Sequence, residues 1–165
     1  MYKFLSLILI LTFSSASYAQ TLKGEHKAWS VFTVKQSGEK ICYITSSPIK
    51  KTGNYKRRGE PYLLVTYRGK GISEVSSSSG YPYKKNSKVD LSLNKKASFK
   101  LFTSSDTPKM AWAKDVSEDK RIISSMKKGS KLTIKGFSKL GTYSLDTYSL
   151  MGFTKAYNKM TSLCR

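Results

Sequence analysis

The C-terminal stretch Lys131–Cys164 is the part of this chain that most constrains its fold. Leu132 and Ile134 alternate with polar neighbours, and the same period of two continues through residues 142–150. This alternation predicts two half-buried β-strands. Apolar residues then recur at the spacing of one helix face, namely Phe153, Ala156, Tyr157 and Met160, with Cys164 extending the stripe. The stretch therefore predicts two strands followed by an amphipathic helix that ends on a cysteine.

The N-terminus has the pattern of an export signal. Lys3 precedes the apolar run Phe4–Phe13, which is too short to span a bilayer, and Ser17-Tyr18-Ala19 has the small-x-small pattern of a cleavage site. We therefore expect residues 1–19 to be a signal peptide and residues 20–165 to form one exported domain. No later apolar run is long enough for a transmembrane segment. The expected location is the periplasm or the outer-membrane surface.

The two cysteines of the chain, Cys42 and Cys164, allow a single pairing. Cysteines of exported proteins usually form disulfides, so we predict a bond between an early strand and the C-terminal helix. The chain contains no CxxC motif, which argues against a redox role.

Short alternating segments elsewhere predict further strands, and turn residues separate them. One predicted helix begins near Asp115 and stops at Gly129. Residues 48–61 and the serine-rich Ser76–Gly80 are predicted loops, and Asn94–Lys96 is a predicted hairpin turn. Seven or eight strands with two short helices favour an all-β sandwich over βαβ units. The predicted strands are Lys27–Val34, Ile41–Thr45, Tyr62–Arg68, Ile72–Ser77, Val89–Leu93, Phe99–Thr103, Leu132–Phe137 and Thr142–Leu150.

The formal net charge of the chain is +20, and most of the cations are lysines. Such a charge attracts polyanions, among them phosphorylated glycolipids, teichoic-type polymers, anionic membranes and nucleic acid. Lysine is a point charge that selects the sign of a partner rather than its geometry. An equally weighted interpretation is a lysine bias that keeps the protein in solution.

The densest basic patch is the predicted loop Pro48–Pro61, and a second basic, aromatic segment is Tyr81–Lys88. Together they form a candidate surface for an anionic glycan or lipid headgroup, with solvated loops as the alternative. The candidate anion-binding residues are Lys50, Lys51, Tyr55, Lys56, Arg57, Arg58, Tyr81, Tyr83, Lys84 and Lys85.

Catalytic and metal-binding patterns are weak. The motifs Ser124-x-x-Lys127 and Lys51-Thr52-Gly53 stand in the wrong order for a penicillin-binding type enzyme. The single histidine, His26, lies close to the expected mature N-terminus, where chains are usually loose. One histidine and two paired cysteines supply too few ligands for zinc. We therefore expect no catalytic residue, metal or cofactor, although Asp146 with Glu74 is a nominal carboxylate pair.

Several motifs carry a resemblance to the invasion-associated locus B family of exported bacterial proteins. They are Ala111-Trp112, Met126 with Gly129, Gly136-x-Ser138-x-x-Gly141-Thr142, Asp146–Leu150, Gly152-Phe153 and Cys164, with looser matches at Trp29, Cys42, Tyr62–Arg68 and Gly80-Tyr81-Pro82. The resemblance implies an immunoglobulin-like β-sandwich, no active site and, in some pathogens, a link to host-cell entry. Relatives often carry an extra cysteine pair, which this chain lacks. The family-motif residues with expected structural roles are Trp112, Gly129, Gly136, Gly141, Asp146, Tyr148 and Gly152.

These motifs also have physical interpretations. Gly136 and Gly141 flank a predicted turn that needs positive φ or close approach, and Gly152 would let the chain turn from strand into helix. Asp146 is expected to accept hydrogen bonds from neighbouring serine or threonine hydroxyls. The two tryptophans, Trp29 and Trp112, sit in apolar strand-like settings that favour core packing over ligand stacking.

The function expected from the sequence is therefore a non-enzymatic envelope protein that binds an anionic polymer, a lipid headgroup or a partner protein. Nucleic acid is not the expected partner. The alternatives are an envelope hydrolase that uses carboxylates such as Asp146, and a periplasmic assembly factor or chaperone that uses an exposed strand edge.

Overall fold

The computed structural model describes residues 20–93 and 97–165. The predicted signal peptide, residues 1–19, and the predicted turn Asn94–Lys96 lie outside the described residues. The strands are β1 (Thr21–His26), β2 (Trp29–Gln36), β3 (Glu39–Ser46), β4 (Lys50–Gly53), β5 (Tyr62–Gly69), β6 (Ile72–Ser78), β7 (Lys88–Leu93), β8 (Ala97–Thr103), β9 (Ala111–Trp112), β10 (Lys131–Phe137) and β11 (Tyr143–Ser149). The helices are α1 (Val116–Lys128) and α2 (Phe153–Cys164).

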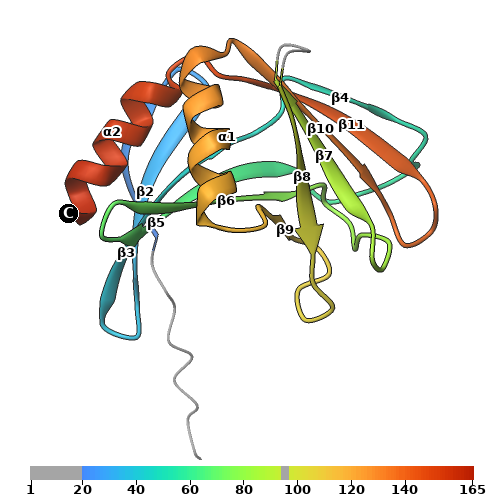
Figure 1. Ribbon diagram of the computed structural model, residues 1–165, viewed down its shortest axis with the longest axis horizontal. Helices are drawn as coiled ribbons and strands as arrows, with labels where there is room; N and C mark the ends of the chain where they lie inside the picture. Colours follow the sequence, from blue (N-terminus) through green and yellow to red (C-terminus); the bar gives the residue numbers. More distant parts are fainter. Residues whose placement is uncertain (1–19, 94–96) are drawn as a thin grey trace, which may run out of the picture.

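The eleven described strands form one antiparallel sheet in the order β1-β2-β3-β5-β6-β9-β8-β7-β10-β11-β4. The short strand β9 joins its two halves, because Trp112 pairs with Ser76 of β6 on one side and with Phe102 of β8 on the other. Figure 1 shows that the sheet bends at this joint, so β5 and β6 run across the direction of β7, β8 and β10. The predicted all-β class with an internal helix and a C-terminal helix is confirmed, and the two layers are halves of one continuous sheet.

The structure adds strands that the sequence patterns did not predict. Part of the predicted loop Pro48–Pro61 is the edge strand β4, which pairs with β11 from Lys50 opposite Thr147 to Gly53 opposite Ser144. Residues near His26 were expected to be loose but form β1, paired with β2. The predicted strand Ile72–Ser77 is present as β6, which extends through Ser78 into the predicted serine-rich loop, and its serines are buried. Backbone pairing explains all three differences, because a ladder of hydrogen bonds does not require an apolar side-chain pattern.

The two helices cover one half of the sheet. Helix α1 packs on β6 and α2 packs on β2 and β3, as Figure 1 shows. Asp115 is the N-cap of α1, where its Oδ1 accepts a hydrogen bond from the Glu118 backbone N–H at 2.9 Å. At the other end, the Gly129 N–H donates to the carbonyl of Met126. Neither described helix is long and apolar enough to cross a membrane.

The predicted disulfide between Cys42 and Cys164 is present. It ties the inner strand β3 to the last residue of α2, with 6.0 Å between the two Cα atoms and a separation of 122 residues along the chain. Trp29 lies beneath the same helix, fully buried, with its ring edge against Phe153 at 5.0 Å between centroids. Its indole N–H donates to the carbonyl of Ser149 at 3.0 Å. The bond and this ring contact together hold α2 onto the sheet.

We predict that breaking the disulfide costs about 4 kcal/mol of the free energy of unfolding, because the bond closes a long loop in the unfolded chain. The measurement is urea unfolding of residues 20–165 with and without a thiol reductant. The Cys42→Ala/Cys164→Ala double variant is the control and should match the reduced protein under both conditions. Equal stability of the oxidised and reduced proteins would contradict the prediction.

Asp119 on α1 is a buried carboxylate that contacts the sheet. Its Oδ1 accepts a hydrogen bond from the Val75 backbone N–H at 2.7 Å. Burial raises the pKa of this carboxyl to about 6, against the lowering effect of that hydrogen bond, and the charges of Glu74, Asp115 and Glu118 raise it further. The folded protein therefore binds a proton here more readily than the unfolded chain does.

This carboxyl predicts a pH dependence of stability. An unfolded aspartate has a pKa near 3.9, so between about pH 4 and pH 6 the folded state holds more protons at Asp119, and its contribution to the free energy of unfolding falls as pH rises. The loss is about 3 kcal/mol at pH 7. Asp119→Asn should abolish this pH-dependent loss of stability, and its amide oxygen can still accept from the Val75 N–H. Asp106→Asn, on an exposed loop, should leave the pH dependence unchanged. Urea unfolding at pH 4.5 and pH 7 measures the difference.

Candidate anion-binding surface

A buried ion pair fixes the loop that follows β4. Arg58 Nη1 donates to Asp146 Oδ2 at 2.7 Å, and Nη2 donates to Oδ1 at 2.5 Å. The two side chains are 3% and 1% exposed. Burial lowers the pKa of the Arg58 guanidinium, but the hydrogen bonds and charge of Asp146 outweigh that effect and raise it. Arg58 therefore stays charged inside the protein and ties its loop to β11.

Neighbouring groups complete the surroundings of Arg58. Tyr55 accepts a hydrogen bond from Nη2 at 3.1 Å, and its ring lies 4.2 Å from the guanidinium carbon. Nη1 also donates to the carbonyl of Ser79 at 3.0 Å. Both oxygens of Asp146 accept from Arg58, a donor that the expectation of serine or threonine hydroxyls did not include.

Two of the predicted surface tyrosines are also buried. The Tyr81 hydroxyl donates to the carbonyl of Gly136 at 2.8 Å, and the Tyr83 hydroxyl lies 2.9 Å from the Ser79 hydroxyl. Burial raises the pKa of both phenols. Gly136 makes this packing possible, since a Cβ there would lie 2.7 Å from the Tyr83 ring. Arg58, Tyr81 and Tyr83 were therefore wrongly assigned to an exposed surface, because all three fill a polar interior between the sheet and its loops.

The other predicted cations remain at the surface. Lys50 and Lys51 lie on the exposed edge strand β4, where Lys51 pairs with Glu60 at 2.6 Å. The remaining four cations lie on exposed loop positions and form no ion pair in the described parts of the chain: Lys56, Arg57, Lys84 and Lys85.

Backbone hydrogen bonds bring these two basic loops to one end of the β10–β11 hairpin. The Asn54 N–H donates to the carbonyl of Tyr143 at 3.2 Å, and the Lys84 N–H donates to the carbonyl of Phe137 at 2.9 Å. The loops also meet each other, since the Gly59 N–H donates to the carbonyl of Gly80 at 2.8 Å. Figure 1 shows the three segments converging at the right of the molecule.

We call this cationic end the basic rim, and it contains one lysine that the sequence analysis did not single out. Lys139 lies in the β10–β11 turn, and its N–H donates to the carbonyl of Pro82 at 2.9 Å. The turn also holds Gly141 and the exposed Leu140. The basic rim consists of Lys56, Arg57, Lys84, Lys85 and Lys139.

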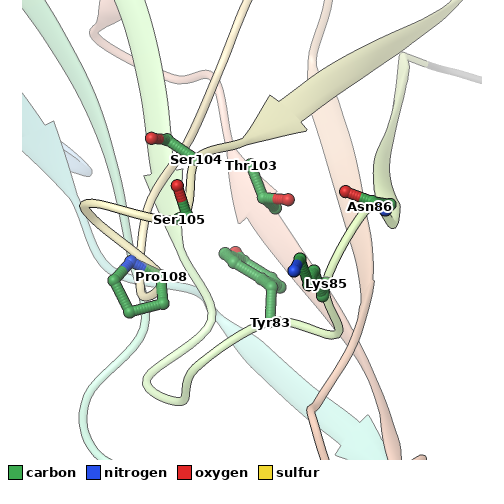
Figure 2. Close-up of a pocket in the computed structure, with 7 residues that line it drawn as sticks. All are labelled: Tyr83, Lys85, Asn86, Thr103, Ser104, Ser105 and Pro108. Carbon is green, nitrogen blue, oxygen red and sulfur yellow. The ribbon is translucent and has the colours of Figure 1, made fainter.

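A pocket of about 620 Å³ adjoins the rim. Figure 2 shows Tyr83 between Lys85 and Asn86 on one side and Ser104, Ser105 and Pro108 on the other. Its polar lining residues carry one ammonium, one amide, the phenol of Tyr83 and three aliphatic hydroxyls, including that of Thr103, without a carboxylate. A second pocket, of about 350 Å³, lies on the basic loop between Lys51 and Pro61. Both pockets offer donors suited to phosphate or carboxylate oxygens.

The nominal catalytic groups are not arranged as a reactive centre. Asp146 is buried against Arg58, and Glu74 pairs with Arg68 at 2.8 Å on the other half of the sheet. His26 lies in β1. Within residues 20–93 and 97–165, no three His, Cys, Asp or Glu side chains are grouped to hold a metal ion.

The remaining motif residues lie at structural positions. Trp112 joins the two halves of the sheet, Gly129 caps α1, and Tyr148 is fully buried on β11. Gly152 begins α2 with a φ of +88°, and a Cβ there would lie 1.9 Å from the carbonyl oxygen of His26. The close approach explains why a glycine stands at this junction.

The comparisons with known proteins identify the family. The family described as Invasion associated locus B (IalB) protein matches residues 29–161. The chain belongs to this family. The solved structure of invasion associated protein B from Bartonella henselae has a similar fold, with a TM-score of 0.62 and 16% identity over 87% of this chain and 96% of that one. No curated protein matches the chain.

Sequence reasoning predicted the hairpin turn of this IalB-family chain but did not place it in the candidate site, and it misplaced Arg58. A signal for both was present in β11, where Ser144, Asp146 and Tyr148 share one face and Tyr143 and Leu145 the other. The structure buries the more polar face. An inverted alternation of this kind indicates a buried polar network behind an exposed apolar face.

We predict that Arg58→Met lowers the free energy of unfolding by about 3–5 kcal/mol, since it leaves the Asp146 carboxylate buried without a partner. The Arg58→Met/Asp146→Leu double variant should recover most of this loss, because apolar groups can replace a buried pair at little cost. Arg57→Met, on the exposed neighbour, should change stability by less than about 0.5 kcal/mol. Urea unfolding measures the stability of all three variants. Equal losses of stability in Arg58→Met and in the Arg58→Met/Asp146→Leu double variant would contradict a paired role for the two residues.

Proposed function

We propose that this IalB-family protein is an exported, non-enzymatic envelope component that binds an anionic polymer or lipid headgroup through the basic rim. The observation that carries the proposal is the convergence of five unpaired cations at one end of the β10–β11 hairpin. They come from three separate segments of the chain.

The distribution of ion pairs supports this choice of site. The described ion pairs are Lys51–Glu60, Arg58–Asp146, Arg68–Glu74, Lys100–Asp90 and Arg121–Glu118. None involves a residue of the basic rim, so the positive potential there is not locally neutralised. Cations in a cluster act together on a polyanion, and salt weakens their attraction. We therefore expect binding that is strong at low ionic strength and that does not require one particular arrangement of the anionic groups.

The alternatives have less support from the structure. A hydrolase based on Asp146 lacks an accessible carboxylate, because both oxygens accept from Arg58 in the interior. An assembly factor would use one of the two sheet edges, β1 or β4. Lys50 and Lys51 lie on β4, and lysines on an edge strand oppose pairing with another strand.

We predict that reversing four rim charges, Lys56→Glu, Arg57→Glu, Lys84→Glu and Lys85→Glu, weakens binding to long-chain polyphosphate and to phosphatidylglycerol vesicles at least about 100-fold at low salt. Each cation near an anionic surface contributes about 1 kcal/mol to the binding free energy. A change of about 1.4 kcal/mol corresponds to a tenfold change in affinity. Titration of the mature protein against each probe measures the change.

A matched control has the same net charge with the rim intact. Lys35→Glu, Lys120→Glu, Lys155→Glu and Lys159→Glu change exposed positions on β2, α1 and α2. This control should bind far more tightly than the rim variant. Equal weakening in both variants would show that net charge alone governs binding, and the basic rim would then not be a site.

A further inference from the structure

We infer that the tip of the β10–β11 hairpin inserts into the interface of an anionic lipid bilayer, with the basic rim contacting the headgroups. The hairpin tip is the segment from Phe137 to Tyr143. This inference rests on the proposed function and deepens it, because it selects a lipid surface over a soluble anionic polymer as the partner.

Exposed apolar side chains distinguish the tip from an ordinary basic loop. Leu140 is 82% exposed at its end, while Phe137, Tyr143 and Leu145 behind it are each 37% exposed. A phosphate polymer offers no medium in which a leucine is buried, whereas a bilayer interface does. Aromatic side chains with a polar end, such as tyrosine, also favour the headgroup level of a membrane.

Lysines surround these apolar groups in the arrangement that such an interface requires. The Lys135 ammonium lies 5.5 Å from the ring centres of both Phe137 and Tyr143, at cation–π distance, so a positive charge stands beside the apolar rings. Lys139 precedes Leu140 in the turn, and Lys84 is hydrogen-bonded to Phe137. The sequence from Lys120 to Leu145 contains no acidic residue, so nothing in this stretch repels an anionic surface.

Several backbone polar groups of the tip are already hydrogen-bonded within the protein. The Gly141 N–H donates to the carbonyl of Ser138 at 2.9 Å, and the Ser138 N–H donates to the carbonyl of Thr142 at 2.7 Å. The Leu140 N–H donates to the Ser138 hydroxyl at 3.2 Å, and that hydroxyl lies 2.7 Å from the Thr142 hydroxyl. Polar groups that are already paired cost less to move into a bilayer interface than unpaired ones.

The test measures partitioning of the mature protein onto vesicles of phosphatidylcholine mixed with phosphatidylglycerol. Leu140→Ser should lower the partition coefficient about tenfold, because the tip then buries no leucine. Leu22→Ser is the matched control, since Leu22 is 49% exposed but lies on β1 at the opposite end of the strand order. The control should not change partitioning, and neither variant should change binding to polyphosphate.

A second measurement reports insertion directly. Fluorescence of a Leu140→Trp variant should be quenched by brominated phosphatidylglycerol beyond the quenching of the unsubstituted protein, and a Leu22→Trp variant should show no such excess. Vesicle binding with no excess quenching and no effect of Leu140→Ser would overturn insertion and leave the basic rim as an anion site. Binding to neither vesicles nor polyphosphate would overturn the proposed function as well.

Discussion

The buried pair of Arg58 and Asp146 is the interaction on which the candidate surface depends. It places a guanidinium from a loop against a carboxylate in the middle of a strand, with both side chains almost fully enclosed. Two charges in an interior need good geometry and further hydrogen bonds. Tyr55 and Ser79 supply two of these, while Arg58 Nε has no partner in the described part of the chain. Once Arg58 points inward, its neighbours Lys56 and Arg57 are left on the outside of a fixed loop.

The same interior polar network holds the second basic loop in place. Ser79 accepts from Arg58 through its carbonyl and contacts Tyr83 through its hydroxyl, while Tyr81 reaches the strand β10 at Gly136. Hydrogen bonds then continue along the backbone from Pro82 and Lys84 to the hairpin. The cations of the basic rim are therefore positioned by buried tyrosines and serines, and their own side chains remain free to contact an anion.

The elements with strong side-chain periodicity were predictable from the sequence, and so was the disulfide. Leu132 and Ile134, and the helical stripe from Phe153 to Met160, point inward as their spacing indicates. The single cysteine pair allowed one bond. Residues of the candidate site were less predictable, because loop composition says that a segment such as Pro48–Pro61 is polar but not which of its arginines turns inward. Arg58 turns inward because it pairs with Asp146, which is 88 residues away in the sequence. A single sequence does not reveal which two distant residues pair.

Family membership explains the fold of this chain. The role of its surface has to be inferred from its own residues. At 16% identity, the likeness to the Bartonella henselae structure concerns the path of the backbone. Packing explains Gly136, Trp112 and Tyr148, which are buried or join strands, but it does not explain Leu140, which contacts little in the fold. Leu140 stands next to Lys139 on a hairpin whose polar face is turned inward, and it is 82% exposed. The insertion inferred above would give this side chain an apolar contact that the fold does not supply.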